Sequence, residues 1–198
     1  MTSHSARLHV VVASALSLLL LTMAALPVSG AELKRREGSE DLVFRLTNCL
    51  RTGGYVTKAG RCQAANSGKF SKYVKPLRRS QKIDNKVAWP WARKSVQFYG
   101  TRTCWIGHAR NSSTVDSRFR SVYLKDPING ENMGCGFYGK PKATIVQVLR
   151  MWQKEKRYNG WHWRLLKDRD FKSAGVGVAS LGSRKAQFVL NLYGQVVR

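Results

Sequence analysis

The chain has 198 residues, of which 35 are Lys or Arg and 11 are Asp or Glu, so its formal net charge is +24 at pH 7. This length suits one domain with its own core, and the charge creates a field that attracts polyanions such as anionic cell-surface polymers or membrane headgroups. The basic residues are scattered and form no dense block typical of nucleic-acid-binding tails, which argues against nucleic acid as the physiological partner.

Residues 1–31 have the pattern of a secretory signal peptide. Arg7 is the only charged side chain before Glu32, a mainly apolar run follows over residues 10–26, and small residues close the segment at Ala31. A membrane anchor is the alternative, but the run is short for one and is interrupted by two serines and a threonine. We therefore expect cleavage after Ala31 and a secreted, extracellular protein.

The first predicted helix follows a charged segment, residues 32–40, that we expect to be a flexible lead-in to a single domain over residues 41–198. Ser39 is a candidate N-cap, and acidic residues follow it in the first turn. Apolar residues then recur at helical spacing, and Gly53-Gly54 ends the pattern. These apolar positions are Leu42, Val43, Leu46 and Leu50.

The middle of the chain predicts little regular structure. Residues 52–85 are rich in Gly, Ser, Lys and Arg, which favours an irregular stretch. A second helix is predicted over residues 88–99, with Pro90 in its first turn. Residues 100–139 contain several glycines and no long periodic run, so we expect loops and short elements there.

The C-terminal part has the clearest signals. Pro141 suits the first turn of a third helix, whose apolar stripe runs to Trp152 and which stops at Asn159-Gly160. Residues 174–180 and 186–193 are strand-like, and the turn residues between them predict a hairpin. Helices followed by a hairpin indicate an α+β domain.

Four cysteines, an even number in an exported chain, indicate two disulfides, and three connectivities are possible. We favour Cys49–Cys62, which is local, and Cys104–Cys135, which would join two segments that carry candidate site residues. Zinc ligation by cysteine is not expected, because the chain has no Cys-x-x-Cys pair.

Histidine and glutamate are scarce outside the first 40 residues. Only His108 and His162 remain, and only Glu131 and Glu155. Such a set can bind a divalent cation such as zinc, with the carboxylates orienting the imidazoles. It can also supply a general acid and base, or form a charged network that braces a cleft. Composition alone favours the brace.

Several short stretches, in order along the chain, resemble one known family. Residues 160–179 read Gly-Trp-His-Trp-Arg-Leu-Leu-Lys-Asp-Arg-Asp-Phe-Lys-Ser-Ala-Gly-Val-Gly-Val-Ala, residues 130–133 Gly-Glu-Asn-Met, residues 152–155 Trp-Gln-Lys-Glu, and residues 107–108 Gly-His. Leu-Thr-Asn at 46–48 and Asn-Leu-Tyr-Gly at 191–194 flank them. The ordered set resembles the CAP superfamily (cysteine-rich secretory, antigen 5 and pathogenesis-related proteins; the SCP-like extracellular domain).

The resemblance implies an α-β-α sandwich of the CAP type that ends in the β-hairpin. It also implies a central cleft lined by the tetrad His108, Glu131, Glu155 and His162, in which His108 and His162 would bind a divalent cation. The chain departs from the family pattern at Trp161, which stands between Gly160 and His162, and residues 111–129 match nothing in it.

The function that we expect is a secreted, non-enzymatic binding protein for a divalent cation, a lipid or an anionic surface. A metal-dependent extracellular hydrolase is the alternative, although the chain has neither His-Glu-x-x-His nor Gly-x-Ser-x-Gly. Sterol or fatty-acid capture is also open, and Trp161 and Trp163, which flank His162, are the candidates for the cleft rim. A cationic protein acting on membranes by its charge is a further alternative.

Overall fold

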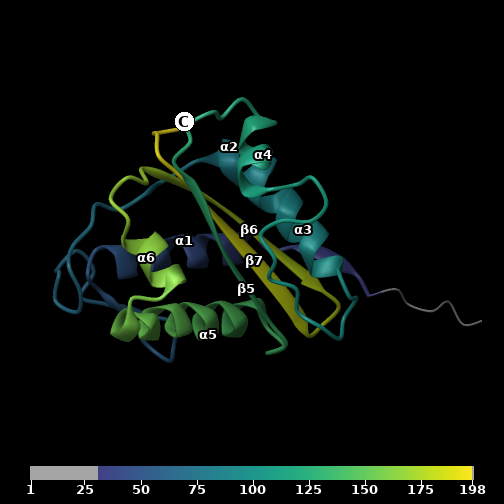
Figure 1. Ribbon diagram of the computed structural model, residues 1–198. Helices are drawn as coiled ribbons and strands as arrows, with labels where there is room; N and C mark the ends of the chain where they lie inside the picture. The colour runs from purple at the N-terminus through teal and green to yellow at the C-terminus, as the bar shows by residue number, and fades with distance from the viewer. Residues whose placement is uncertain (1–30, 198) are drawn as a thin grey trace, which may run out of the picture.

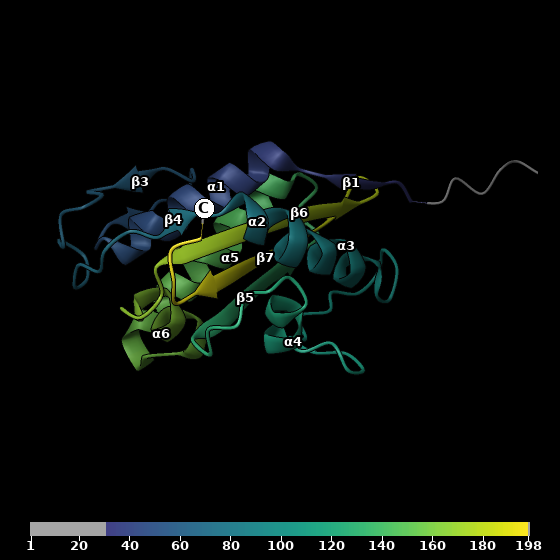
Figure 2. The same ribbon diagram turned by 90° about the horizontal axis from the view of Figure 1, so that it is seen from above.

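The computed structural model describes residues 31–197, which form a central sheet with helices on both faces (Figures 1 and 2). The signal peptide predicted for residues 1–31 lies outside the described residues, apart from Ala31. The strands are β1 (Leu33–Arg35), β2 (Tyr55–Val56), β3 (Cys62–Gln63), β4 (Arg78–Arg79), β5 (Asn129–Gly136), β6 (Ser173–Leu181) and β7 (Lys185–Tyr193). The helices are α1 (Glu37–Arg51), α2 (Gln81–Ile83), the π-helix η1 (Asp84–Ala88), α3 (Trp89–Gln97), α4 (Val115–Arg120), α5 (Pro141–Lys154), the 3-10 helix η2 (Glu155–Tyr158) and α6 (Trp161–Lys167).

The central sheet has the order β1-β6-β7-β5, and β4 adds to β6 in parallel. The C-terminal hairpin predicted from sequence is confirmed: β6 and β7 pair antiparallel along their whole length, with Gly175 opposite Asn191. β5 pairs antiparallel with the other side of β7 and forms the edge of the sheet. The predicted α-β-α sandwich is likewise confirmed.

Side chains of β6 alternate between two cores. Val176 and Val178 point toward α1 and α5 and join the larger core, whereas Ala179 joins the core beneath α3. This alternation follows from the two-residue period of a strand. Helices α1, α5 and α6 therefore cover one face, and η1, α3 and α4 cover the other (Figure 2). No helix within residues 31–197 is both long and apolar enough to span a bilayer.

Two predictions for the N-terminal half are wrong in detail. Residues 32–40 are not an unstructured lead-in: β1 pairs with β6, and α1 begins at Glu37, before the predicted cap Ser39. The second helix also starts earlier than predicted, because α2 and η1 lead directly into α3 from Gln81. The reason is partly local, since Ser80 caps α2 by accepting a hydrogen bond from Ile83 N, and partly tertiary, since Ile83 is fully buried.

The expected loop region at residues 100–139 contains one long strand, β5, which is the main correction. Its sequence, Asn-Gly-Glu-Asn-Met-Gly-Cys-Gly, has no β-branched residue and three glycines. A side chain at Gly134 would collide with the Phe188 ring, 2.4 Å from the ideal Cβ, and with Val148. The strand is thus set by pairing to β7 and close packing, and local propensity gives no sign of it.

Both predicted disulfides are confirmed, and all four cysteines are paired. The Cys49–Cys62 bond joins α1 to β3, with a Cα–Cα distance of 5.9 Å. The Cys104–Cys135 bond joins the loop after α3 to β5, with a Cα–Cα distance of 5.8 Å. It closes a loop that contains both His108 and Glu131.

The C-terminal end of α1 is fastened by two cations, the buried Arg51 and the half-buried Lys167. The Arg51 guanidinium donates to the carbonyl oxygens of Leu166 at 2.8 Å and Asp168 at 2.9 Å, and also to those of Lys75 and Phe171. Lys167 Nζ donates to the carbonyl oxygens of Arg51 at 2.7 Å and Leu50 at 3.1 Å. These are the carbonyls that a helix end leaves unpaired, so the two side chains join α1 to α6 and the loop after it.

We expect the stability contributed by Lys167 to rise as pH increases from about 8. Burial, with repulsion from Arg51 and Lys156, lowers the Lys167 pKa to about 8. Between that value and the ordinary lysine value of 10.5, the unfolded chain binds more protons than the folded one, so unfolding becomes more costly with rising pH. Urea unfolding from pH 7 to 10 should show the native protein gaining stability relative to Lys167→Met. The exposed Lys75→Met should track the native protein, and parallel curves for native and Lys167→Met would contradict the expectation.

Candidate functional site

The four predicted site residues form two histidine–carboxylate pairs. His108 Nδ1 lies 3.0 Å from Glu131 Oε1, and His162 Nδ1 lies 2.7 Å from Glu155 Oε1. A carboxylate can only accept, so each Nδ1 carries the proton and donates it. Each imidazole is therefore oriented by a carboxylate behind it, and each Nε2 is directed away from that carboxylate.

Glu131 is held from three sides. Its side chain is fully buried, and Oε2 accepts hydrogen bonds from Arg118 Nη2 at 2.6 Å and Asn191 Nδ2 at 3.0 Å, while Oε1 takes His108. Asn191 stands directly opposite Glu131 in the β5–β7 register, which explains the contact. Arg118 comes from α4, and its guanidinium also lies over the Trp91 ring, 4.0 Å from the centroid. A buried carboxylate needs such partners.

The loop that carries His108 is fixed to the sheet at several points. The disulfide at Cys104 ties it to β5, and Gln187 of β7 donates to the Trp105 carbonyl at 2.6 Å. Trp105 packs edge-on against Phe98 and Trp91 at centroid distances of 4.7 and 5.5 Å. Arg118 Nη1 donates to the carbonyl of His108 itself at 3.1 Å. The backbone under His108 is thus fixed although its side chain is 47% exposed.

The second pair is built where α5 ends. Glu155 follows α5 in η2, Asn159 takes the left-handed conformation with φ of 54°, and α6 starts after Gly160. Glu155 Oε2 accepts from the backbone N of Trp163 at 3.2 Å, and the ring of His162 stacks on Trp152 at 5.1 Å and 9°. A side chain at Gly160 would lie 2.6 Å from Glu155 Oε2. The predicted helix break is therefore what turns His162 back onto Glu155.

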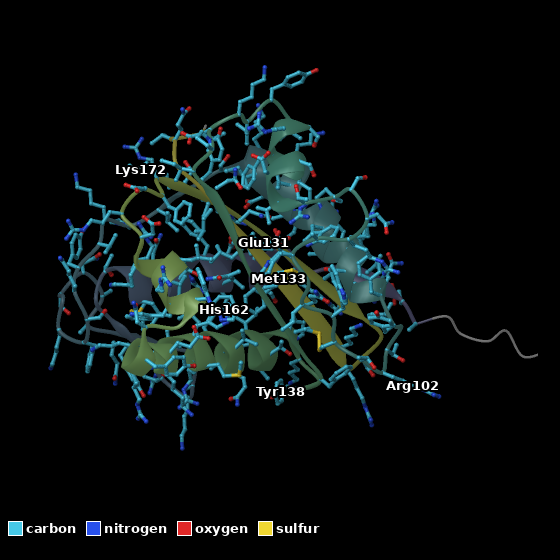
Figure 3. All side chains as sticks on the ribbon, viewed as in Figure 1. Arg102, Glu131, Met133, Tyr138, His162 and Lys172 are labelled. Atoms are coloured by element: carbon cyan, nitrogen blue, oxygen red, sulfur yellow. A yellow bond between two sulfur atoms is a disulfide. The ribbon has the colours of Figure 1, made fainter. Side chains whose placement is uncertain are left out.

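The two pairs lie on opposite sides of the edge strand β5. Consecutive strand residues point to opposite faces, and Glu131 holds His108 on the α4 side while Asn132 donates to the carbonyl of His162 at 3.2 Å on the α6 side. Figure 3 shows Glu131 at this strand and His162 on the side where α5 and α6 lie. The adjacent strand residues Glu131 and Asn132 thus connect the two histidines to the same part of β5.

The donor set fits a metal ion in part. Neutral imidazole nitrogens bind zinc, and ligating histidines commonly donate their other N–H to a carboxylate, which is the arrangement of both pairs. His162 is 30% exposed, so both imidazoles are accessible to solvent. Within residues 31–197, however, no three His, Cys, Asp or Glu side chains are grouped to hold an ion. A cation at the two histidines would therefore need water to complete its coordination.

Burial sets the electrostatics around Glu131. Desolvation lowers the pKa of Arg118 below the ordinary arginine value, and the attraction of Glu131 opposes that shift. The guanidinium and the carboxylate are mutually dependent, since each would be a buried charge without the other.

Sequence reasoning missed part of the site and misplaced one residue. Arg118 is one of many basic residues and lies in the segment that matched nothing, so no signal marked it. Asn132 and Asn191 were within the quoted motifs, but no role was assigned to them. Trp161 is 72% exposed, beside Arg164. Trp163, predicted at the cleft rim, is 7% exposed and packs in the main core, because the helical spacing of α6 turns it inward.

Comparisons with known proteins bear on the fold. The sequence matches no protein-family model and no curated protein. The structure is similar to a 1.5 Å crystal structure of an extracellular protein containing an SCP domain from Bacillus anthracis str. Ames, with a TM-score of 0.51 and 15% identity. The match covers 80% of this chain and 41% of that one, so this chain spans less than half the length of its structural neighbour. The chain is therefore similar in fold to this SCP-containing protein, as the sequence resemblance implied.

Proposed function

We propose that this chain is an extracellular binding protein whose CAP-fold site holds a divalent cation, zinc being the leading candidate, between His108 and His162. One observation carries the proposal: each Nδ1 donates to a carboxylate, at 3.0 and 2.7 Å, which leaves each Nε2 as the nitrogen available for a ligand. Export is supported by the signal-peptide pattern, by two disulfides and by the extracellular structural neighbour.

Binding is favoured over hydrolysis by how the carboxylates are used. Glu131 accepts from an arginine, an asparagine and a histidine, and Glu155 accepts from His162 and a backbone N–H. A general base must be free to take a proton from a reacting group. Both carboxylates are instead committed to orienting the imidazoles, as in a binding site that is formed before its ligand arrives.

We expect zinc to bind the oxidised protein, residues 32–198, with one ion per chain in isothermal titration calorimetry at pH 7. The His108→Ala/His162→Ala variant should lose the signal. Glu155→Gln should bind about 10- to 100-fold more weakly, because the partner behind a ligating histidine fixes its tautomer and orientation.

Arg110→Ala is the matched control, since Arg110 is exposed and lies near His108 in the chain, while its guanidinium lies over the Phe98 ring and forms no hydrogen bond with either histidine within residues 31–197. It should bind zinc as the native protein does. If the native protein gives no heat on zinc addition, or if the double histidine variant gives the same heat, the proposed zinc site is wrong. The two histidine–carboxylate pairs would then only stabilise the edge of the sheet.

A further inference from the structure

Four surface hollows follow one another along the loops beside α1, η2, α6 and α5, and each shares lining residues with the next. The first, of about 830 Å³, lies between residues 73–78 and 169–172, and Lys75, Arg78, Arg169 and Lys172 line it. Val74 and Arg169 also line the second, of about 440 Å³. The second adds the cations Lys72, Lys156 and Lys167.

The groove continues along α5. The third hollow, of about 410 Å³, shares Ser71, Lys156 and Trp163 with the second and adds Arg150, Lys154 and Arg157. Arg150 also lines the fourth, of about 360 Å³, together with Lys58, Lys140 and Lys142. Figure 3 shows the two ends on separate parts of the molecule: Lys172 lies near the C-terminus and Tyr138 beyond the start of α5. We call these four hollows the basic groove.

The basic groove is an uncompensated positive surface. No Asp or Glu of residues 31–197 lines any of its four hollows, and none of its cations is within ion-pair distance of a carboxylate of the described chain. Another hollow of the described chain does hold neutralised arginines. In a hollow at the start of α1, Arg35 and Arg79 contact Glu40, Asp41 and Asp84. The four hollows therefore bring together cations that have no carboxylate beside them in the described chain, although exposed cations on other faces also lack an ion pair.

Some of the groove's cations are held in place by the fold. Lys156 Nζ donates to the Phe70 carbonyl, and Lys167 Nζ donates to the carbonyls at the end of α1 and to Ser71 Oγ at 3.2 Å. Lys156 and Arg51 both lower the pKa of Lys167, after burial itself. A bound anion would relieve this repulsion between neighbouring cations. Because hydrogen bonds already hold these lysine side chains, binding would cost less conformational entropy.

We propose that the basic groove binds a linear acidic polysaccharide, one whose sulfate or carboxylate groups repeat along the chain. The occupant must be extended, because the four hollows follow one another over loop, helix end and helix. It must carry repeated negative charge, since every hollow contributes at least three cations. Most of these are lysines, which act as mobile point charges and suit diffuse polyanion binding better than the planar, bidentate readout typical of arginine.

The aromatic residues of the groove favour a polysaccharide over single-stranded nucleic acid. Nucleic-acid grooves present successive aromatic faces on which bases stack. Here Phe171 and Trp163 are buried, and the well-exposed rings, Tyr73 and Tyr138, stand toward opposite ends of the groove. Between them, Tyr55 and Phe70 are half-buried and pack on each other with centroids 5.4 Å apart, so the groove has no run of open aromatic faces. A polymer that needs charge contacts without continuous stacking is the better fit.

The test is binding of the oxidised chain to two acidic polysaccharides, heparin and polygalacturonate, by fluorescence anisotropy at 50 and 300 mM NaCl. A long oligosaccharide that spans several hollows should bind at least tenfold more tightly than a tetrasaccharide, because each hollow adds charge contacts. Binding should weaken with salt. The two polymers distinguish sulfate from carboxylate as the preferred anion.

Location is tested by two triple charge reversals with the same change in net charge. Lys72→Glu/Lys154→Glu/Arg169→Glu alters three exposed groove cations, and Lys86→Glu/Arg93→Glu/Lys125→Glu alters three exposed cations on the other helical layer. The groove variant should bind on the order of 30-fold more weakly, at roughly threefold per exposed charge contact. The control variant should change affinity less than threefold. Circular dichroism should show both variants folded.

The histidine site is tested apart from the groove: His108→Ala/His162→Ala should bind the polysaccharides as the native protein does, whether or not it binds zinc. An equal loss of polysaccharide affinity in both triple variants would overturn the proposal, because affinity would then depend on the net charge of the protein and not on the position of the cations. So would tighter binding to a single-stranded oligonucleotide, or to phosphatidylserine vesicles, than to a polysaccharide matched in charge. Absence of polysaccharide binding at 50 mM NaCl would overturn it outright.

Discussion

Gly177→Ala is expected to lower the free energy of unfolding by about 3 kcal/mol, a large effect for one methyl group. Gly177 lies in β6 where the strand passes the junction of η1 and α3. An ideal Cβ at this position would lie 2.5 Å from the carbonyl carbon and oxygen of Ala88 and from the backbone N of Trp89. These are backbone atoms of a helix, so no side chain can rotate away to make room.

Gly175 repeats the arrangement one helical turn earlier, with its Cβ position 2.5 Å from Ile83 C and Asp84 N. The Gly-Val-Gly-Val run of β6 therefore has two purposes. Its glycines let the η1–α3 backbone touch the strand, while its valines fill the core on the opposite face. An added methyl group must push the helical layer off the sheet, because a packed interior has no free space for it.

Gly38→Ala is the matched control for Gly177→Ala. Gly38 lies in α1, and its ideal Cβ has no atom within 4 Å. Alanine there should leave stability unchanged or raise it by up to about 1 kcal/mol through helix propensity. Guanidinium unfolding of the oxidised variants measures both changes. Equal stabilities for Gly177→Ala and the native protein would show that strand and helix are further apart than the structure places them.

The amino-acid sequence predicts the elements whose signals are local. The β6–β7 hairpin has alternating apolar residues and turn residues, and α5 has a proline start, an apolar stripe and an Asn159-Gly160 stop; both were predicted close to their observed limits. β5 was missed because its glycines and asparagines are poor strand formers. Only the facing β7 and the overlying α5 make it a strand.

The same division applies to the candidate site. His108, Glu131, Glu155 and His162 could be selected because histidine and glutamate are rare in this chain, and the structure pairs them two by two. Arg118 could not be selected, since 35 residues of the chain are Lys or Arg and its place beside Glu131 depends on how α4 packs on β5. The basic groove was beyond sequence reasoning for a similar reason: it gathers cations from segments more than 100 residues apart.

Arg118→Met is expected to lower the free energy of unfolding by about 3 kcal/mol, because it leaves a fully buried carboxylate without its cation. The Arg118 guanidinium contacts Glu131 Oε2 at 2.6 Å, donates to the His108 carbonyl and lies on the Trp91 ring. Methionine keeps much of the apolar contact with Trp91, so the loss in free energy of unfolding comes mainly from removing the positive charge. Arg120→Met, two residues away, removes an exposed pair with Asp116 and should leave stability nearly unchanged.

A double-mutant cycle separates the ion pair from the rest of the Arg118 contacts. If the ion pair accounts for most of the effect, the double variant Arg118→Met/Glu131→Gln should lose less free energy of unfolding than the two single variants lose together. The reason is that the double variant buries no unpaired charge. Urea unfolding of the four proteins gives the coupling free energy. Additive effects would mean that Arg118 acts only through Trp91 and the His108 carbonyl. Strong coupling would make Arg118 the residue that holds the Glu131 carboxylate in place beneath His108, and so a positioning residue for the imidazole that we propose as a ligand.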